Sequence, residues 1–283
     1  MTPFQLRAYV MYLKTRPCFA DHPFTKQQSK CLSGSTIYNY VKSLRIFFSW
    51  LYEEGIIDAH PFERVKIPKL PKKIVQTFSE DNVRAVLREI NIETAVGFRD
   101  FTIILMFLDT GVRLSELTGL CVSDLLLEEG IARVMGKGQK QRIVPLGKQL
   151  IGYLWRYLSF HRPEPLMPKD DRVFLTERGQ PLKKDRVEHI VKHYGLKAGI
   201  KGVRLSPHTF RHTSAVTFLR NGGDVFTLQR MLGHSSLEMT RHYCQVADVD
   251  VKRAHITASP VDNLGISSPH RAAPRHGQEK RGR

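Results

Sequence analysis

A strongly apolar segment at residues 98–111, FRDFTIILMFLDTG, places the main constraint on how this chain can fold. It is too short to cross a bilayer, which takes about 20 apolar residues, and no other apolar run in the sequence is long enough either. The glycine at its end is typical of a helix stop. The segment therefore predicts a helix buried in a protein core and ended by Gly111. We expect neither a membrane span nor a signal peptide, because the first helix-like segment is already mixed in polarity.

The charge balance points to a polyanionic partner. Lys and Arg number 44 against 27 Asp and Glu, which gives a net charge of +17 and a pI near 9.9. Such an excess strains a compact surface through self-repulsion unless a polyanion offsets it. Nucleic acid is the first candidate, because neutralising its phosphates releases counterions. An acidic membrane surface is the second.

The cysteines indicate a reducing compartment. Cys18, Cys31, Cys121 and Cys244 are scattered along the chain. They form neither the CxxC pairs of a zinc site nor the closely spaced set of a disulfide scaffold. The 12 histidines leave room for a metal site by number, but we expect none. We therefore predict a cytoplasmic protein without a metal.

Residues 1–68 are predicted to form a small helical domain. FQLRAYVMYLKTR is one helix, and TIYNYVKSLRIFFSWLYEEG is a stronger one. The second is expected to follow Ser35 as its N-cap and to stop at Gly55. Lys42 and Arg45 lie on its polar face. Its apolar stripe consists of Ile37, Tyr40, Val41, Leu44, Phe47, Phe48 and Leu51.

The segment KIPKLPKKIVQ predicts a linker at residues 69–76 and a little before it. Two prolines punctuate it, and its basic residues are Lys66, Lys69, Lys72 and Lys73. Such an extended, basic chain suits a linker lying along a phosphate backbone, and a solvated hinge is an equal alternative.

Residues 77–258 are predicted to form a second domain, mainly helical with one small antiparallel sheet. Ser79 is the expected N-cap of one helix, and Ser206 with Pro207 begins another. The run IARVMGKGQKQRIVPL has two β-like stretches around a Gly-Lys-Gly turn, which is a hairpin signal. Residues 259–283 are polar, Pro-rich and basic, and predict a disordered tail that touches DNA.

Several cationic residues stand where folding can bring them to one cleft. Arg113 follows the stop of the buried helix, and Lys137 sits between the glycines of the hairpin turn. His208 and Arg211 share the first turn of a helix, where the dipole favours an anion. Each also has a plain structural explanation, such as an Arg113–Glu116 helix pair or a solvated turn lysine.

The segment MLGHSSLEMTRHYCQV, residues 231–246, admits two explanations for its tyrosine. Tyr243 is spaced four residues from Met239, so it could be a core residue whose hydroxyl finds a partner. Ser235 and the glutamate three residues later predict a capping box, so a helix begins there. His234 then lies in the preceding turn, from which it can share a phosphate with Tyr243.

In order along the chain, these motifs resemble the active site of the tyrosine recombinases, also called phage-type integrases, and among them the Xer-like and mobile-element branch. That active site reads as arginine, lysine, His-x-x-Arg, His or Trp, and tyrosine. The motifs are TGVRLSEL, GKGQKQRIVPL, PHTFRHT, LGHSS and TRHY. They supply the candidate catalytic residues Arg113, Lys137, His208, Arg211, His234 and Tyr243.

The resemblance implies that DNA is cut and rejoined through a covalent intermediate. Tyr243 would attack the scissile phosphate and give a 3′-phosphotyrosine and a free 5′-hydroxyl, with no metal, ATP or other cofactor. Arg113 and Arg211 would hold the non-bridging oxygens. Glu116, one turn beyond Arg113, would have a supporting role beside that arginine.

The remaining polar residues would transfer protons or contact the phosphate. Lys137 would protonate the leaving 5′-oxygen, and His234 would donate to a phosphate oxygen. His208 would act as base toward the tyrosine or assist the phosphate contacts.

The resemblance also implies partners and domain roles. Residues 1–68 would be a helical, SAM-like DNA-binding domain whose first helix is missing, because MTPFQLRAYVMYLKTR resembles the second helix of that domain. Residues 77–258 would be the catalytic domain. The expected partners are double-stranded DNA, a homotetramer on two DNA sites, and accessory DNA-bending or directionality factors. The protein would be cytoplasmic and associated with the nucleoid.

Three functions stay open at this point. The first is strand exchange, for integration or excision of a mobile element or for Xer-like resolution. The second is relaxation of one duplex by the same chemistry, as in type IB topoisomerases. The third is a catalytically decayed DNA-binding remnant, against which the complete set of catalytic residues argues.

Overall fold

The computed structural model of the chain describes residues 2–63, 65, 76–136 and 141–234, followed by residues 236, 237, 240, 241, 243 and 244. The chain divides into two compact units, Met1–Lys73 and Ile74–Arg283. Apart from Gln76, the predicted linker at residues 69–76 lies outside the described residues, and so does the predicted tail at residues 259–283. The same is true of Lys66, Lys69, Lys72 and Lys73.

The first unit is built from two helices, α1 (Pro3–Thr15) and α2 (Gly34–Glu53), which pack against each other. Its core consists of Leu6, Leu13, Val41 and Phe62. The prediction that Ser35 is the N-cap of α2 is wrong. Ser33 has the extended backbone of a cap and its hydroxyl accepts the N–H of Thr36 at 3.2 Å, whereas Ser35 already lies inside the first helical turn.

Only part of the apolar stripe predicted for α2 is covered. Ile37, Leu44 and Phe48 pack against the core, but the side chains of Tyr40 and Phe47 are 47% and 51% exposed. The ring of Phe48 lies 6.3 Å from that of Phe62, measured between centroids. Lys42 and Arg45 are exposed, as predicted for the polar face.

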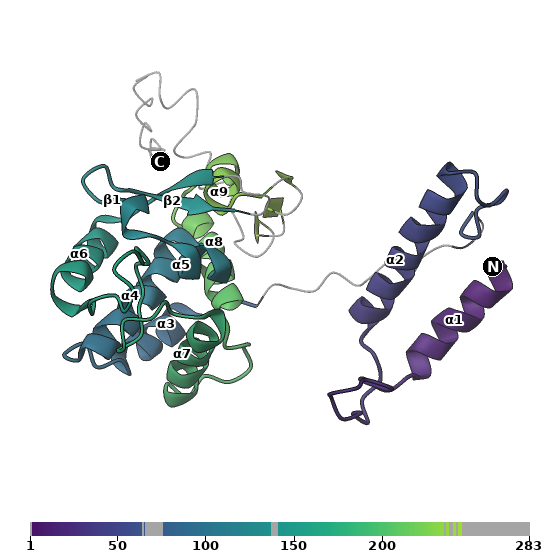
Figure 1. Cartoon of the computed structure of the whole chain (residues 1–283), viewed down its shortest axis with the longest axis horizontal. Helices are drawn as coiled ribbons and strands as arrows, with labels where there is room; N and C mark the ends of the chain where they lie inside the picture. The colour runs from purple at the N-terminus through teal and green to yellow at the C-terminus, as the bar shows by residue number, and fades with distance from the viewer. Residues whose placement is uncertain are drawn as a thin grey trace, which may run out of the picture. The chain divides into compact units, whose positions relative to one another are not determined.

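The second unit is organised around α4 (Ala95–Thr110), which packs against α6 (Lys148–Arg156), the π-helical turn η2 (Tyr157–His161) and α8 (Pro207–Arg220) (Figure 1). The side chains of Ile103, Ile104, Met106 and Phe107 on α4 are fully buried. Burial on nearly every side explains why the sequence of this helix is apolar all round. The prediction of a buried helix ending at Gly111 is confirmed.

The sheet has three antiparallel strands in the order β1 (Leu125–Leu126), β2 (Ile131–Met135) and β3 (Gln141–Pro145). The β2–β3 register runs from Ile131 opposite Pro145 to Met135 opposite Gln141, which confirms the predicted hairpin. Lys137, in the connecting turn, lies outside the described residues.

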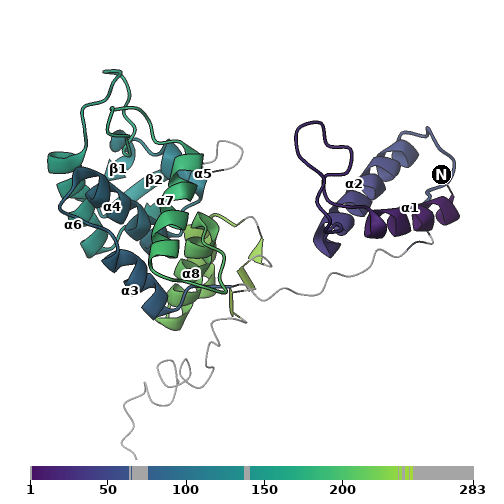
Figure 2. The same ribbon diagram turned by 90° about the horizontal axis from the view of Figure 1, so that it is seen from below.

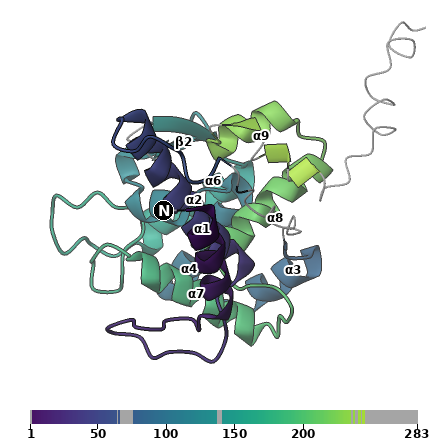
Figure 3. The ribbon, with the colours of Figure 1, turned by 90° about the vertical axis from the view of Figure 1, so that its right-hand side faces the viewer.

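The other helices surround this centre. They are α3 (Glu80–Arg88), α5 (Leu114–Gly119), the 3-10 turn η1 (Val122–Asp124), α7 (Lys184–Lys197) and α9 (Val225–Leu232). Helix α7 contacts α5 and α8 (Figure 2), and α9 contacts α8 (Figure 3). Helix α9 also contacts β3. Ser79 caps α3 and Ser206 caps α8, as predicted. The described residues thus form a mainly helical protein with a small antiparallel sheet, which confirms the predicted fold class.

Within the described parts of the chain, no helix is both long enough and apolar enough to cross a membrane.

Candidate active site

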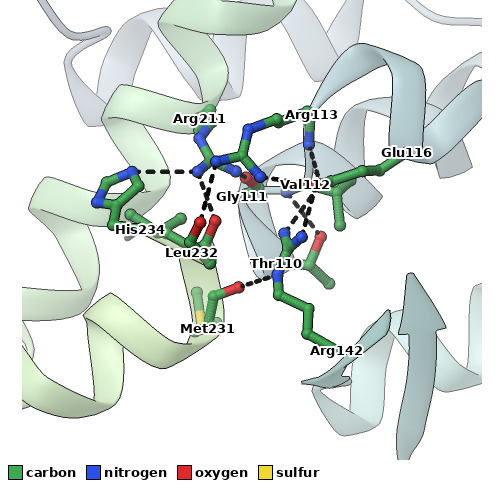
Figure 4. Close-up of polar contacts among 11 residues, drawn as sticks. Thr110, Gly111, Val112, Arg113, Glu116, Arg142, Arg211, Met231, Leu232 and His234 are labelled. Carbon is green, nitrogen blue, oxygen red and sulfur yellow. Dashed lines mark hydrogen bonds and ion pairs between the residues drawn. The ribbon is translucent and has the colours of Figure 1, made fainter. Parts of the chain in front are cut away.

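Two helix ends bring distant segments to the same place. Gly111 ends α4 with φ 60°, and Gly233 ends α9 with φ 63°. Both values lie in the left-handed region, which glycine adopts without the steric cost of a Cβ. The chain turns sharply after each glycine, so Arg113 becomes the N-cap of α5 and His234 follows α9 directly. These turns bring both residues to the guanidinium group of Arg211, which His234 contacts directly (Figure 4).

Arg113 is fixed by the carboxylate of Glu116. Its backbone N–H donates to Glu116 Oε2 at 2.7 Å, and its Nη1 donates to Oε1 at 2.8 Å. Its Nη2 donates to the carbonyl oxygen of Gly233 at 3.2 Å. The Arg113 side chain remains 33% exposed, so part of its guanidinium faces solvent. Glu116, which was predicted to support Arg113, thus contacts both its backbone and its side chain.

Arg142, on β3, is a second cation on the same carboxylate. Its Nη1 and Nη2 donate to Glu116 Oε1 and Oε2 at 2.5 and 2.8 Å, which is a bidentate pair. Its Nε donates to the carbonyl oxygen of Met231 at 3.0 Å. Arg142 therefore ties the sheet to α5 and to the end of α9.

The pKa of Glu116 reflects these contacts. Burial raises the pKa of the carboxyl, but hydrogen bonds from Arg142 and from the backbone and side chain of Arg113 more than offset this effect. The net result is a pKa lowered to about 2. Glu116 is therefore ionised at neutral pH, and its charge holds both guanidinium groups in place.

Arg211, on α8, is buried and held by two helix-end carbonyls. Its Nη1 donates to the carbonyl oxygen of Gly111 at 2.5 Å, and its Nη2 donates to that of Leu232 at 2.7 Å. Burial, and next the charge of Arg113, lower its pKa to about 10, so it stays charged at neutral pH. These carbonyls sit at the negative ends of α4 and α9, which favours a cation there.

His234 connects Arg211 to the last described helical residues. Its Nε2 lies 3.2 Å from Arg211 Nη2, and its Nδ1 lies 3.0 Å from the Thr240 hydroxyl. A guanidinium can only donate, so Nε2 must accept and Nδ1 carries the proton toward Thr240. Burial and the nearby guanidinium groups of Arg211, Arg113 and Arg142 lower the pKa of His234 to about 4. His234 is thus a neutral ring of defined tautomer.

Tyr243 is buried, with 4% of its surface exposed. Its hydroxyl lies 2.8 Å from Nδ1 of His212, and its ring stacks on that of His234 at a centroid distance of 6.1 Å. Burial raises the pKa of the phenol, while the charges of Arg211 and Arg113 oppose this rise. The hydroxyl is therefore protonated at neutral pH. The ring of His234 lies between Tyr243 and the guanidinium group of Arg211.

An open cleft of about 490 Å³ lies beside the cluster. Arg113, His208 and Arg211 line it, together with Lys184 and Arg204. His208 is exposed, and loss of hydration, followed by the charges of Arg211, Arg204 and Arg113, lowers its pKa. A cleft with this excess of cationic side chains suits a phosphate group.

Comparison with known proteins agrees with this geometry. The sequence matches the model of the phage integrase family over residues 76–249. It is 39% identical over 216 residues to the tyrosine recombinase XerD of Proteus mirabilis, covering 76% of this chain and 69% of that one. It is 33% identical over 246 residues to XerD of Pseudomonas aeruginosa, covering 87% and 82% of the two chains. This chain belongs to the phage integrase family. It is a tyrosine-type site-specific recombinase.

Solved structures of recombinases share its fold. The crystal structure of XerA recombinase matches with a TM-score of 0.56 and 26% identity, covering 92% of this chain and 83% of that one. XerH recombinase, in its post-cleavage complex with the palindromic difH substrate, matches with a TM-score of 0.69 and 22% identity, covering 93% and 73%.

The structure of this recombinase brings most of the candidate residues together. Four of them, Arg113, Arg211, His234 and Tyr243, lie in one cluster, with Glu116 beneath Arg113 and His208 at the adjoining cleft. Lys137 and the capping box at Ser235 lie outside the described residues. Lys42 and Arg45 belong to the first unit and stay DNA-binding candidates.

Sequence reasoning missed three residues of the cluster. Arg142 could have been found, because it lies two residues from the buried Val144 and therefore shares the inward face of its strand. His212 directly follows Arg211 and repeats four residues after His208, which puts it on the same helix face. Thr240 carries no signal of its own in the sequence.

Two histidine pairs, His189/His193 and His208/His212, have the spacing of a helical metal site. Among the described residues, no group of three or more histidine, cysteine, aspartate or glutamate side chains is arranged to hold a metal ion.

Proposed function

We propose that the arginine cluster binds the scissile phosphate of a DNA duplex and that Tyr243 attacks it. The observation that carries this proposal is the shared anchoring of the two arginines beside the tyrosine. Arg113 and Arg211 donate to the adjacent carbonyl oxygens of Gly233 and Leu232. Arg211 also contacts His234, whose ring stacks on that of Tyr243. Attack forms a bond between the phenolic oxygen and phosphorus and releases the 5′-oxygen of the next nucleotide. The product is a 3′-phosphotyrosine, formed without a metal or ATP.

The roles of the arginines follow from their exposure and contacts. Arg113 keeps part of its guanidinium free toward the cleft, so it can grip a non-bridging oxygen. Among the described residues, the contacts of Arg211 engage three of its five N–H groups, which leaves two for the phosphate. Glu116 and Arg142 hold Arg113 in position. The charge that develops on the phosphate is thus met by groups that are already oriented.

The lysine and the histidines would transfer protons and contact the phosphate. Lys137, expected on the turn of the β2–β3 hairpin, would protonate the leaving 5′-oxygen. His234 would donate to a phosphate oxygen through Nε2 once that oxygen replaces Arg211 as its partner, with Nδ1 then accepting the Thr240 hydroxyl. His208 would contact the phosphate from the cleft. The phosphotyrosine retains the energy of the phosphodiester, so a 5′-hydroxyl from a second duplex can reverse the step.

We propose strand exchange between two DNA sites as the overall reaction, in integration, excision or Xer-like resolution. The XerD relatives support exchange over the relaxation of a single duplex. XerH, a structural neighbour, is bound to its difH site, and we propose that this chain likewise acts on a specific duplex. Exchange between two duplexes calls for four active subunits, hence a homotetramer, with accessory DNA-bending or directionality factors. The protein would act in the cytoplasm, at the nucleoid.

The first unit and the linker are proposed to hold the DNA. Lys42 and Arg45 are exposed on the same helix, where they can reach phosphates. Lys66, Lys69, Lys72 and Lys73 would follow the backbone. Reversing the charge of Lys42 and Arg45 should weaken binding and flatten its salt dependence.

The test is covalent trapping. DNA is first selected from a pool of random duplexes by binding to the whole chain. The selected duplex is then nicked next to each position in turn and incubated with the protein in EDTA. We expect a protein–DNA band that survives SDS, persists in EDTA and disappears in Tyr243→Phe. Tyr194→Phe is the matched control, because it removes a hydroxyl that bonds Asp100 away from the cluster. An adduct that persists in Tyr243→Phe, or one that requires a metal, would contradict the proposal.

A second assay separates exchange from relaxation. The selected site is placed on two plasmids, and a supercoiled plasmid without the site serves as the comparison. Recombinant product from the paired sites supports exchange. Relaxation of the plasmid without recombinants would favour the topoisomerase reaction.

A further inference from the structure

His212 is the group in direct contact with the hydroxyl of Tyr243. Its Nδ1 lies 2.8 Å from the phenolic oxygen, which is hydrogen-bonding distance. The two rings are 5.5 Å apart between centroids. The ring of His234 lies against the same tyrosine. The nucleophile proposed above is therefore held between two histidines from separate segments.

His212 occupies a rigid position. It follows Arg211 on α8, and Arg211 is anchored by the carbonyl oxygens of Gly111 and Leu232. Helix α8 is packed against α4 at the centre of the unit. A base on such a scaffold can be aimed at the nucleophile before substrate arrives, which is the geometric condition for proton transfer.

The surroundings keep the imidazole unprotonated. Burial, followed by the charges of His208, Arg211 and His234, lowers the pKa of His212 to about 4. A neutral imidazole has one nitrogen that can accept a proton. The phenol O–H is the stronger acid of the two neutral partners, so it donates and Nδ1 accepts. The hydrogen bond thus already points in the direction of proton transfer.

We propose that His212 is a catalytic residue that accepts the phenolic proton of Tyr243 during attack on DNA. This role rests on the proposed function, in which Tyr243 is the nucleophile. As the bond between the phenolic oxygen and phosphorus forms, the proton moves to Nδ1 and the bond from phosphorus to the 5′-oxygen breaks. The 5′-oxygen takes a different proton, from the acid on the leaving-group side. On rejoining, His212 returns its proton to the departing phenolate.

His208, which the sequence suggested as base, occupies a different position relative to Tyr243. It is exposed at the cleft, and its ring meets the ring of His212 edge-on at a centroid distance of 4.2 Å. The described contacts of the Tyr243 hydroxyl go to His212. His208 is thus the neighbour of the proton acceptor and faces the phosphate.

Two substrates distinguish a base at the tyrosine from an acid at the leaving group. One is the selected nicked duplex with its natural 5′-oxygen, and the other carries a bridging sulfur in that position. Sulfur leaves without a proton, so a variant that lacks the leaving-group acid recovers on the sulfur substrate. We expect Lys137→Ala to recover. We expect His212→Ala to form adduct ~10²–10⁴-fold more slowly on both substrates, the usual range for general base catalysis.

A matched pair of substitutions separates proton acceptance from simple positioning. His212→Asn places an amide oxygen near the position of Nδ1, so it can hold the hydroxyl but cannot take its proton. We expect His212→Asn to remain slow on both substrates and added imidazole to restore part of the rate of His212→Ala. His22→Asn is the control, since it alters an imidazole that accepts the backbone N–H of Phe24 in the other unit.

Several outcomes would overturn the inference. If His212→Asn reaches the rate of the unaltered chain, the histidine only positions the tyrosine. If His212→Ala is as fast as or faster than the unaltered chain, the contact is neither catalytic nor positioning. Thermal unfolding and DNA binding are measured for each variant, and if His212→Ala unfolds, His212→Asn on the two substrates carries the test. A persistent adduct in Tyr243→Phe would instead refute the proposed function, so the two failures differ.

Discussion

Replacing Glu116 by glutamine should destabilise the catalytic unit, because it leaves two guanidinium groups without their shared carboxylate. The Glu116 side chain is 1% exposed and that of Arg142 is 13% exposed, so at Arg142 water cannot take the place of the lost charge. Glutamine keeps the volume and one acceptor oxygen. The change therefore tests the charge and leaves the packing intact.

The size of the effect follows from the pKa of the carboxyl. A fall from the ordinary 4.5 to about 2 corresponds to about 3 kcal/mol of stabilisation near neutral pH, at 1.36 kcal/mol per pH unit. Removal of one partner from a buried ion pair generally costs about 3–5 kcal/mol. Both routes place the loss in Glu116→Gln at about 3 kcal/mol.

The same reasoning sets the pH dependence. The pKa of Glu116 is lower in the folded state than in the unfolded state, so its contribution is complete above the unfolded value of 4.5 and disappears as pH falls toward about 2. The difference in unfolding free energy between the unaltered chain and Glu116→Gln should therefore shrink from about 3 kcal/mol near pH 7 to about 1 kcal/mol near pH 3.

Urea unfolding measures this difference if the two units are followed separately. The chain has two tryptophans, Trp50 in the first unit and Trp155 in the second. In a Trp50→Phe background, fluorescence of Trp155 reports the catalytic unit. A loss below about 1 kcal/mol near neutral pH, or a difference that stays constant into the acid range, would refute the assignment of Glu116 as the charge that holds the arginines.

Three further changes test other parts of the unit. Gly111→Ala should lower the unfolding free energy by about 1–2 kcal/mol, because φ is 60° there and a Cβ would come within 2.8 Å of Leu232 Cδ2; an unchanged urea midpoint would contradict the stated backbone requirement. Thr240→Val should slow adduct formation by about 3–10-fold with DNA binding unaltered, since His234 Nδ1 loses a hydrogen bond. Equal rates would show that the tautomer is set elsewhere. Ser79→Ala should cost about 1 kcal/mol in urea unfolding through loss of the α3 N-cap, and no change would indicate that another group replaces the cap.

Local chemistry made several features predictable from the sequence. The apolar run ending at Gly111, the caps at Ser79 and Ser206, and the β2–β3 hairpin depend on residues close in the chain. Side-chain spacing, caps and turns act within a few residues, so their signals survive in the sequence. Even locally, competition between similar residues misleads, as Ser33 and Ser35 show at the start of α2.

The candidate catalytic residues were also visible in the sequence, through their motifs and order. Their partners were not. The carboxylate of Glu116 meets Arg142 across 26 residues of chain, and His212 meets Tyr243 across 31. Spacing says nothing about such pairs, because they form only when α5, β3, α8 and the end of the chain pack together. The sequence by itself determined which residues could bind a phosphate and attack it. The tertiary structure decided which carboxylate holds the arginines and which histidine receives the tyrosine's hydrogen bond, because both depend on distances that arise from packing.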